Sequence, residues 1–147
     1  MVMQSDRGQR KSLKAVIESL RDYIMTCPLL RDGTLNVDYL PEHVSYSIDS
    51  MPGDPWYKKY VDGGGIRQLY FAITSKEAYG EDVLANIGNS GFYQALEEWL
   101  YKNSLNDNLP ILDGYKAVRI ETTATAYLMY ADVGLGNYQI QCRLLYE

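Results

Sequence analysis

Residues that commonly do chemistry are scarce in this sequence and stand apart from one another. The single histidine, His43, precedes a predicted strand, and no nucleophile motif accompanies it. The two cysteines, Cys27 and Cys142, have neither Cys-x-x-Cys spacing nor a neighbouring histidine. We therefore expect no metal site, two free thiols, and a surface or hydrogen-bonded role for the histidine.

Two acidic pairs and one glycine run match functional motifs only in part. The pairs are Glu81-Asp82 and Glu97-Glu98. Neighbouring residues on a helix point about 100° apart, so neither pair converges on a substrate, and both are interpreted as solvated faces. The run Gly63-Gly64-Gly65 lacks the Gly-Lys-Ser/Thr ending of a phosphate loop, which favours a simple turned connection. No cofactor is predicted, and we expect the protein not to be an enzyme.

The charge balance argues against nucleic-acid binding. The 147 residues carry a formal net charge of −5, whereas contacts to phosphate require clustered Lys and Arg. The basic residues that do cluster are interpreted as a solvated helix start: Arg7, Arg10, Lys11 and Lys14. No apolar run approaches the length of a membrane span, and no signal peptide is recognised, so we expect a protein that is intracellular at synthesis.

Two helices are predicted from apolar periodicity. Residues 1–11 are expected to form a flexible N-terminus, and 12–147 a single α+β domain. The first helix runs from Ser12 to about Thr26, before Pro28. The second is expected to begin at Ser90 as its N-cap, after a short helical piece at 82–87. Its predicted core stripe is Phe92, Ala95, Leu96, Trp99 and Leu100.

Alternation of apolar and polar residues predicts the strands. Strands are expected at 44–50 and 66–74, which should pair, with a short one at 35–37. The last three are expected at 115–122, 126–133 and 137–146, as a meander whose final turn is 134–137. The strand at 126–133 is apolar on both sides and is expected to be central and covered on both faces. The order predicts an α+β fold: a mainly antiparallel sheet of about five strands with two helices packed on one face.

The segment 51–65 combines Pro and Gly with aromatic and cationic side chains. The chain has 14 Tyr against 2 Phe and 2 Trp, and Tyr suits both half-buried sheet faces and interfaces. Irregular structure is expected here, so its aromatic residues must pack either on their own sheet or on a neighbouring molecule. The candidate interface residues are Trp56, Tyr57, Lys58, Lys59 and Tyr60.

Four segments, taken in their order, carry a resemblance to a known family. They are Leu20-Arg21-Asp22-Tyr23-Ile24, Tyr60-Val61-Asp62-Gly63-Gly64, Asn86-Ile87-Gly88-Asn89-Ser90-Gly91-Phe92-Tyr93 and Tyr138-Gln139-Ile140-Gln141-Cys142-Arg143-Leu144. From Ser12 to Glu147 the chain resembles small structural proteins of tailed bacteriophages and prophages of Firmicutes, called minor capsid proteins, which are similar to tail terminators. The glycine-rich stretch 133–137 departs from that pattern.

The resemblance implies an α+β protein that forms a ring, commonly a hexamer, at the neck of the virion. Such a ring caps the finished tail tube and joins it to the head connector or neck adaptor. Genomic DNA passes through without specific binding, and no membrane is involved. The protein would occupy the host cytoplasm during assembly and then the virion. Two alternatives stay open: another head–tail adaptor or tail-tube-like assembly protein, and a small-molecule-binding α+β domain.

Overall fold

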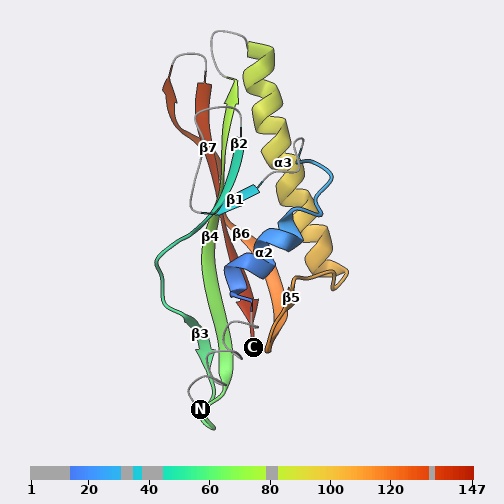
Figure 1. The fold of residues 1–147 in the computed structure, drawn as a ribbon, viewed down its shortest axis with the longest axis vertical. Helices are drawn as coiled ribbons and strands as arrows, with labels where there is room; N and C mark the ends of the chain where they lie inside the picture. Colours follow the sequence, from blue (N-terminus) through green and yellow to red (C-terminus); the bar gives the residue numbers. More distant parts are fainter. Residues whose placement is uncertain (1–13, 31–34, 38–44, 79–82, 133–134) are drawn as a thin grey trace, which may run out of the picture.

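The computed structural model describes residues 14–30, 35–37, 45–78, 83–132 and 135–147. Its helices are α2 (Val16–Ile24) and α3 (Val83–Leu105). Its strands are β1 (Leu35–Val37), β2 (Ser45–Ser50), β3 (Trp56–Lys59), β4 (Gly65–Ala78), β5 (Ile111–Leu112), β6 (Tyr115–Asp132) and β7 (Leu135–Tyr146). The predicted α+β class is confirmed (Figure 1). The predicted flexible N-terminus, His43, and the basic residues Arg7, Arg10 and Lys11 lie outside the described residues.

The sheet is built around the long strand β4. Its strand order is β1-β2-β4-β7-β6-β5, and β3 also pairs with β4. Phe71 lies between Ser50 of β2 and Cys142 of β7, whereas Arg67 lies between Trp56 of β3 and Tyr146 of β7. Strands β2 and β3 therefore share one edge of β4, and β7 takes the other. The predicted strand at 35–37 and the pairing of β2 with β4 are both confirmed.

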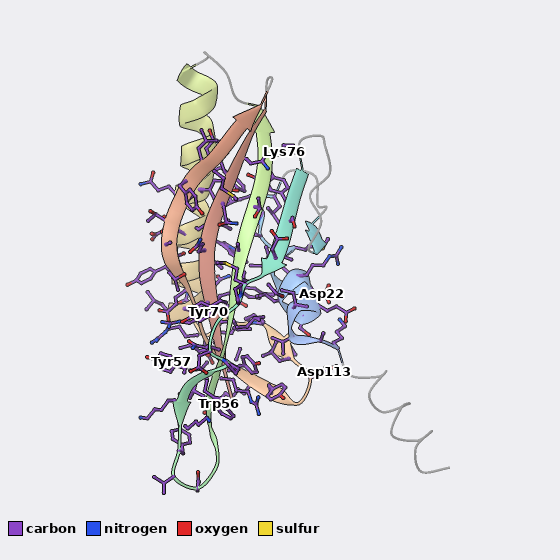
Figure 2. The ribbon with its side chains drawn as sticks, turned by 90° about the vertical axis from the view of Figure 1, so that its left-hand side faces the viewer. Asp22, Trp56, Tyr57, Tyr70, Lys76 and Asp113 are labelled. Carbon is purple, nitrogen blue, oxygen red and sulfur yellow. The ribbon has the colours of Figure 1, made fainter. Side chains whose placement is uncertain are left out.

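One face of this sheet carries the core, and both helices cover that face (Figure 2). The alternation predicted for β7 is confirmed between Tyr138 and Leu144, because Tyr138, Ile140, Cys142 and Leu144 are all buried. It fails at Asn137, which is predicted on the open side and is buried. The helical residues buried in the same cluster are Leu20, Tyr23 and Ile24 of α2 and Tyr93, Leu96 and Leu100 of α3. Each fully buried Leu or Ile contributes about 1.5–3 kcal/mol through removal of apolar surface from water.

Tyr23 joins the two helices. Its ring lies 5.3 Å from the ring of Trp99. Its hydroxyl donates to the carbonyl oxygen of Asn108 at 2.9 Å and accepts from Nδ2 of Asn103 at 3.0 Å. The short helix α2 is thus held against the end of α3 as well as against the sheet.

The predicted C-terminal meander of three strands is wrong, because its first two strands are the single strand β6. This strand pairs with β7 through several register shifts, including one between Ala117 and Arg119. Such bulges interrupt the alternation of side chains, so Val118 is exposed although Ala117 and Ile120 are buried. The predicted turn at 134–137 is also wrong, since Leu135 already belongs to β7 and pairs with Asp132.

Strand β6 does not lie in the centre of the sheet, contrary to the prediction. Its outer neighbour β5 pairs only with Tyr115 and Lys116. In the described part of the chain, no strand covers its outer edge after that point. Helix α3 packs on one face of β6, but on the other face Tyr127 and Met129 are nearly half exposed. Apolar residues on both sides therefore did not indicate burial on both sides.

Helix α3 begins earlier than predicted. It starts at Val83 and continues through Gly88, so the expected short helical piece and second helix are one element, and Ser90 is not an N-cap. Packing against the sheet outweighs the cost of an internal glycine, which is about 1 kcal/mol. The predicted stripe is also partly wrong, since Ala95 is exposed and Tyr93 is buried. Among the described residues, no helix is long and apolar enough to cross a membrane.

Candidate interaction surface on the β3–β4 hairpin

Strands β3 and β4 form a hairpin that extends beyond the end of β7 (Figure 1). Its tip closes with a hydrogen bond of 2.7 Å from Tyr60 N–H to the carbonyl oxygen of Gly64. Within the tip, Gly64 N–H donates to Oδ1 of Asp62 at 3.1 Å. Gly63 has φ of +96°, a conformation that favours glycine. The expectation of irregular structure throughout 51–65 is therefore wrong, because β3 pairs with β4.

Two contacts explain why β3 can form in a segment rich in Pro and Gly. A Cβ atom on Gly65 would lie 2.3 Å from the carbonyl oxygen of Lys58, so only glycine permits this close strand approach. The side chain of Gln68 donates from Nε2 to the carbonyl oxygens of Asp54 at 2.8 Å and Trp56 at 3.2 Å. Gly65 and Gln68 thus position the hairpin, and sequence reasoning did not identify either of them.

Trp56 packs on its own hairpin. It is half-buried, and the guanidinium of Arg67 lies 4.4 Å from the centre of its ring. Nζ of Lys59 lies 5.4 Å from the same ring. Arg67 also lies 5.9 Å from the ring of Tyr115, which makes an edge contact with Tyr146. This stack of aromatic and cationic groups fastens β3 to the main sheet.

Tyr57 contacts the open face of the sheet, which the helices leave uncovered (Figure 2). The guanidinium of Arg143 lies 5.1 Å from the Tyr57 ring and 5.9 Å from the Tyr70 ring. The same guanidinium donates to Oε1 of Glu121 at 2.6 Å. Partial burial lowers the pKa of Arg143, but its interactions with Glu121 and Tyr70 outweigh this and raise the pKa. Arg143 therefore stays charged and anchors the root of the hairpin.

The outer surface of the hairpin is aromatic and cationic. Tyr57 and Tyr60 are nearly half exposed, Val61 is fully exposed, and Lys58 and Lys59 are exposed. Neither lysine makes an ion pair with a carboxylate that the structure describes. The five predicted interface residues thus lie on one hairpin: Trp56 and, in part, Tyr57 pack on their own sheet, whereas Lys58, Lys59 and Tyr60 are presented to solvent. Such a rigid patch suits recognition of another protein.

The cysteines are not placed for catalysis. Burial raises the pKa of the Cys142 thiol to about 12 and raises that of Cys27 as well, which disfavours the reactive thiolate. Within the described ranges, no group of three or more His, Cys, Asp and Glu side chains is gathered as a metal site requires. Neither thiol therefore offers an activated nucleophile.

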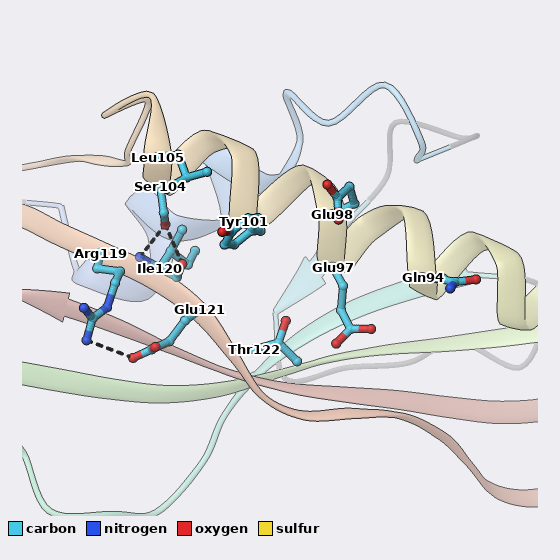
Figure 3. A pocket seen from close by; sticks show the side chains of 10 residues that line it. All are labelled: Gln94, Glu97, Glu98, Tyr101, Ser104, Leu105, Arg119, Ile120, Glu121 and Thr122. Atoms are coloured by element: carbon cyan, nitrogen blue, oxygen red, sulfur yellow. Dashed lines mark hydrogen bonds and ion pairs between the residues drawn. The ribbon is translucent and has the colours of Figure 1, made fainter.

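A groove of about 730 Å³ lies between α3 and β6 (Figure 3). Its serine, Ser104, is engaged with the backbone of Ile120: its Oγ donates to the carbonyl oxygen at 2.5 Å and accepts from the N–H at 3.1 Å. Among the residues that the structure describes, neither a histidine nor a cysteine lines the groove. The Ser104 hydroxyl is thus held by the backbone of β6 and is not paired with a general base among the described residues.

Neither the models of known protein families nor the curated proteins match this chain.

Proposed function

We propose that this protein is a structural virion protein of a tailed phage or prophage, a tail terminator that forms a ring at the neck and caps the tail tube. The observation that carries the proposal is the β3–β4 hairpin. It extends beyond β7, is fastened at its root by Arg67 and Arg143, and exposes aromatic and cationic side chains.

The hairpin has the properties of a protein-binding element rather than a nucleic-acid-binding one. Tyr and Trp provide large contact areas at low cost in conformational entropy, and they dominate binding energy at interfaces. The two lysines are local exceptions in a chain whose net charge is −5. An acidic surface on a neighbouring subunit is therefore complementary to the hairpin, whereas the chain as a whole repels phosphate.

The size and charge of the subunit are compatible with the proposed ring. A chain of 147 residues can surround a DNA-wide passage only by repetition, and head-to-tail contacts that close by rotation give such a ring. Six subunits at −5 each carry −30. Such a wall repels DNA and lets it pass without binding.

The test is the native mass of the purified protein, measured by light scattering over a range of concentrations and again after addition of isolated tail tubes. A single closed mass, alone or on tubes, supports the terminator. Open-ended growth into tubes would instead identify a tail-tube-like protein. A protein that stays monomeric and does not bind tubes would contradict the proposal.

A further inference from the structure

The groove between α3 and β6 holds a carboxylate whose charge is not balanced. Glu97 points from α3 toward Thr122 of β6 (Figure 3) and is half-buried. It also lines a second groove of about 460 Å³ beside the first. In the described part of the chain, Glu97 has no ion-pair or hydrogen-bond partner.

The other two carboxylates of this groove already have cationic partners. Glu121 lies 2.6 Å from Arg143 and 3.5 Å from Arg119, and Glu98 lies 3.9 Å from Lys102. Among these three carboxylates, Glu97 is therefore the one that a cation from another molecule would stabilise most. A half-buried charge is solvated less well than an exposed one, so an incoming ammonium group would compensate it.

The surroundings of Glu97 have the features of a docking surface. Tyr101 and Leu105 of α3 line the groove and are 58% and 68% exposed. The outer edge of β6 beside them lacks a strand partner in the described sheet. Because β6 is bulged, a partner is expected to enter through side chains rather than as an added strand.

We propose that this groove receives the β3–β4 hairpin of a second copy of the chain, with Lys58, which lies on the same side of β3 as Tyr60, placed against Glu97, and Tyr60 against Tyr101 and Leu105. Charge complementarity favours a second copy as the partner, since Lys58 and Lys59 are both exposed and make no ion pair with a described carboxylate. The inference rests on the proposed ring.

The positions of the two surfaces fit a head-to-tail contact. Strand β3 lies on one edge of β4, and β6 lies on the far side of β7. Hairpin and groove therefore occupy opposite edges of the sheet, so each copy can offer its hairpin to one neighbour and its groove to the other. Contacts of this type form a ring when the rotation between copies closes.

Charge reversal tests the contact. Glu97→Lys and the double variant Lys58→Glu/Lys59→Glu should each raise the dissociation constant of self-association by about tenfold to a hundredfold, because like charges then meet. Combining all three substitutions should restore most of the association. Glu18→Lys on α2 is the matched control, since it makes the same change at an exposed helical position. Light scattering gives the association, and circular dichroism shows that each variant is folded.

Four outcomes would overturn the inference. If the folded Glu97→Lys variant associates as tightly as the wild type, the contact between hairpin and groove is refuted, but the proposed ring is not. Equal weakening by Glu18→Lys, or no recovery in the combined variant, shows that the weakening does not come from this contact. A wild-type chain that stays monomeric at every concentration and on tail tubes overturns both the contact and the ring.

Discussion

Replacing Gly65 with Ala should open the β3–β4 hairpin, whereas replacing its neighbour Gly64 should not. A Cβ on Gly65 would lie 2.3 Å from the carbonyl oxygen of Lys58 and 3.0 Å from both Cα of Lys59 and Cζ3 of Trp56. A Cβ on Gly64 would meet its nearest atoms at 3.6 Å, which is ordinary contact. The two positions are adjacent, yet only at Gly65 do backbone atoms of β3 occupy the space that a Cβ would need.

The expected difference in free energy of unfolding follows from these contacts. Forcing an extra carbon into a filled space costs about 1–3 kcal/mol. Both substitutions reduce the entropy of the unfolded chain similarly, so that effect cancels when the two variants are compared. At about 4 °C per kcal/mol, Gly65→Ala should melt roughly 4–12 °C below Gly64→Ala. Separation of β3 from β4 relieves the clash, so the difference in melting temperature should not exceed this range.

Hydrogen exchange and native mass complete the assay. In Gly65→Ala the amide protons of β3 should exchange faster, those of β7 should keep their protection, and the ring should be lost. Equal melting temperatures and equal exchange in the two variants would refute the close strand approach. A variant with an open hairpin that still forms the ring would refute the role given to the hairpin.

Four further predictions concern single residues and conditions. Trp56→Ala should lower the free energy of unfolding by about 0.5–1 kcal/mol, because a cation–π stack is lost, and should weaken the free energy of assembly by more than that. Equal losses in these two free energies would mean that Trp56 only packs on its own sheet. Burial raises the pKa of Cys142 from 9.0 to about 12, so the unfolded thiol loses its proton first as the pH rises. Stability should therefore fall between pH 9 and 12 by up to about 1.4 kcal/mol per pH unit, and urea unfolding of Cys142→Ala should lack this component. Raising salt from 10 to 150 mM shortens the screening length from about 30 to 8 Å and so weakens both the repulsion between acidic subunits and the lysine–Glu97 attraction. With −5 on each subunit the repulsion is the larger of the two, so salt should favour assembly, and light scattering that shows dissociation would contradict this. His43→Gln should leave folding and assembly unchanged, and loss of the ring in a folded variant would argue against a purely structural protein.

Periodicity predicted the parts of the fold in which one face is covered and the other is not. Strand β7 has a buried face and a more exposed one, so its alternation identified both the strand and the burial of Cys142. Periodicity failed for β6, where bulges shift the register and make one long strand look like two. It also failed at the start of α3, because Gly88 looked like a boundary although packing carries the helix through it.

The composition of the candidate site was predictable, but its geometry was not. Trp56 to Tyr60 stood out as aromatic and cationic residues between Pro and Gly. The groups that make them a hairpin, above all Gly65 and Arg143, act through pairing and stacking that the local sequence does not encode. Glu97 and Glu98 looked alike in the sequence, yet the orientation of α3 places Glu97 half-buried beside β6 and leaves Glu98 exposed.

We propose that copies of this chain form a ring at the head-proximal end of a phage tail. Electron microscopy of assembled tails, with the protein located by a bound antibody fragment, tests this most directly. We predict one ring of density at the end of the tube that meets the head, and none along its length. Labelling repeated along the tube, or particles that lack the protein, would contradict the account.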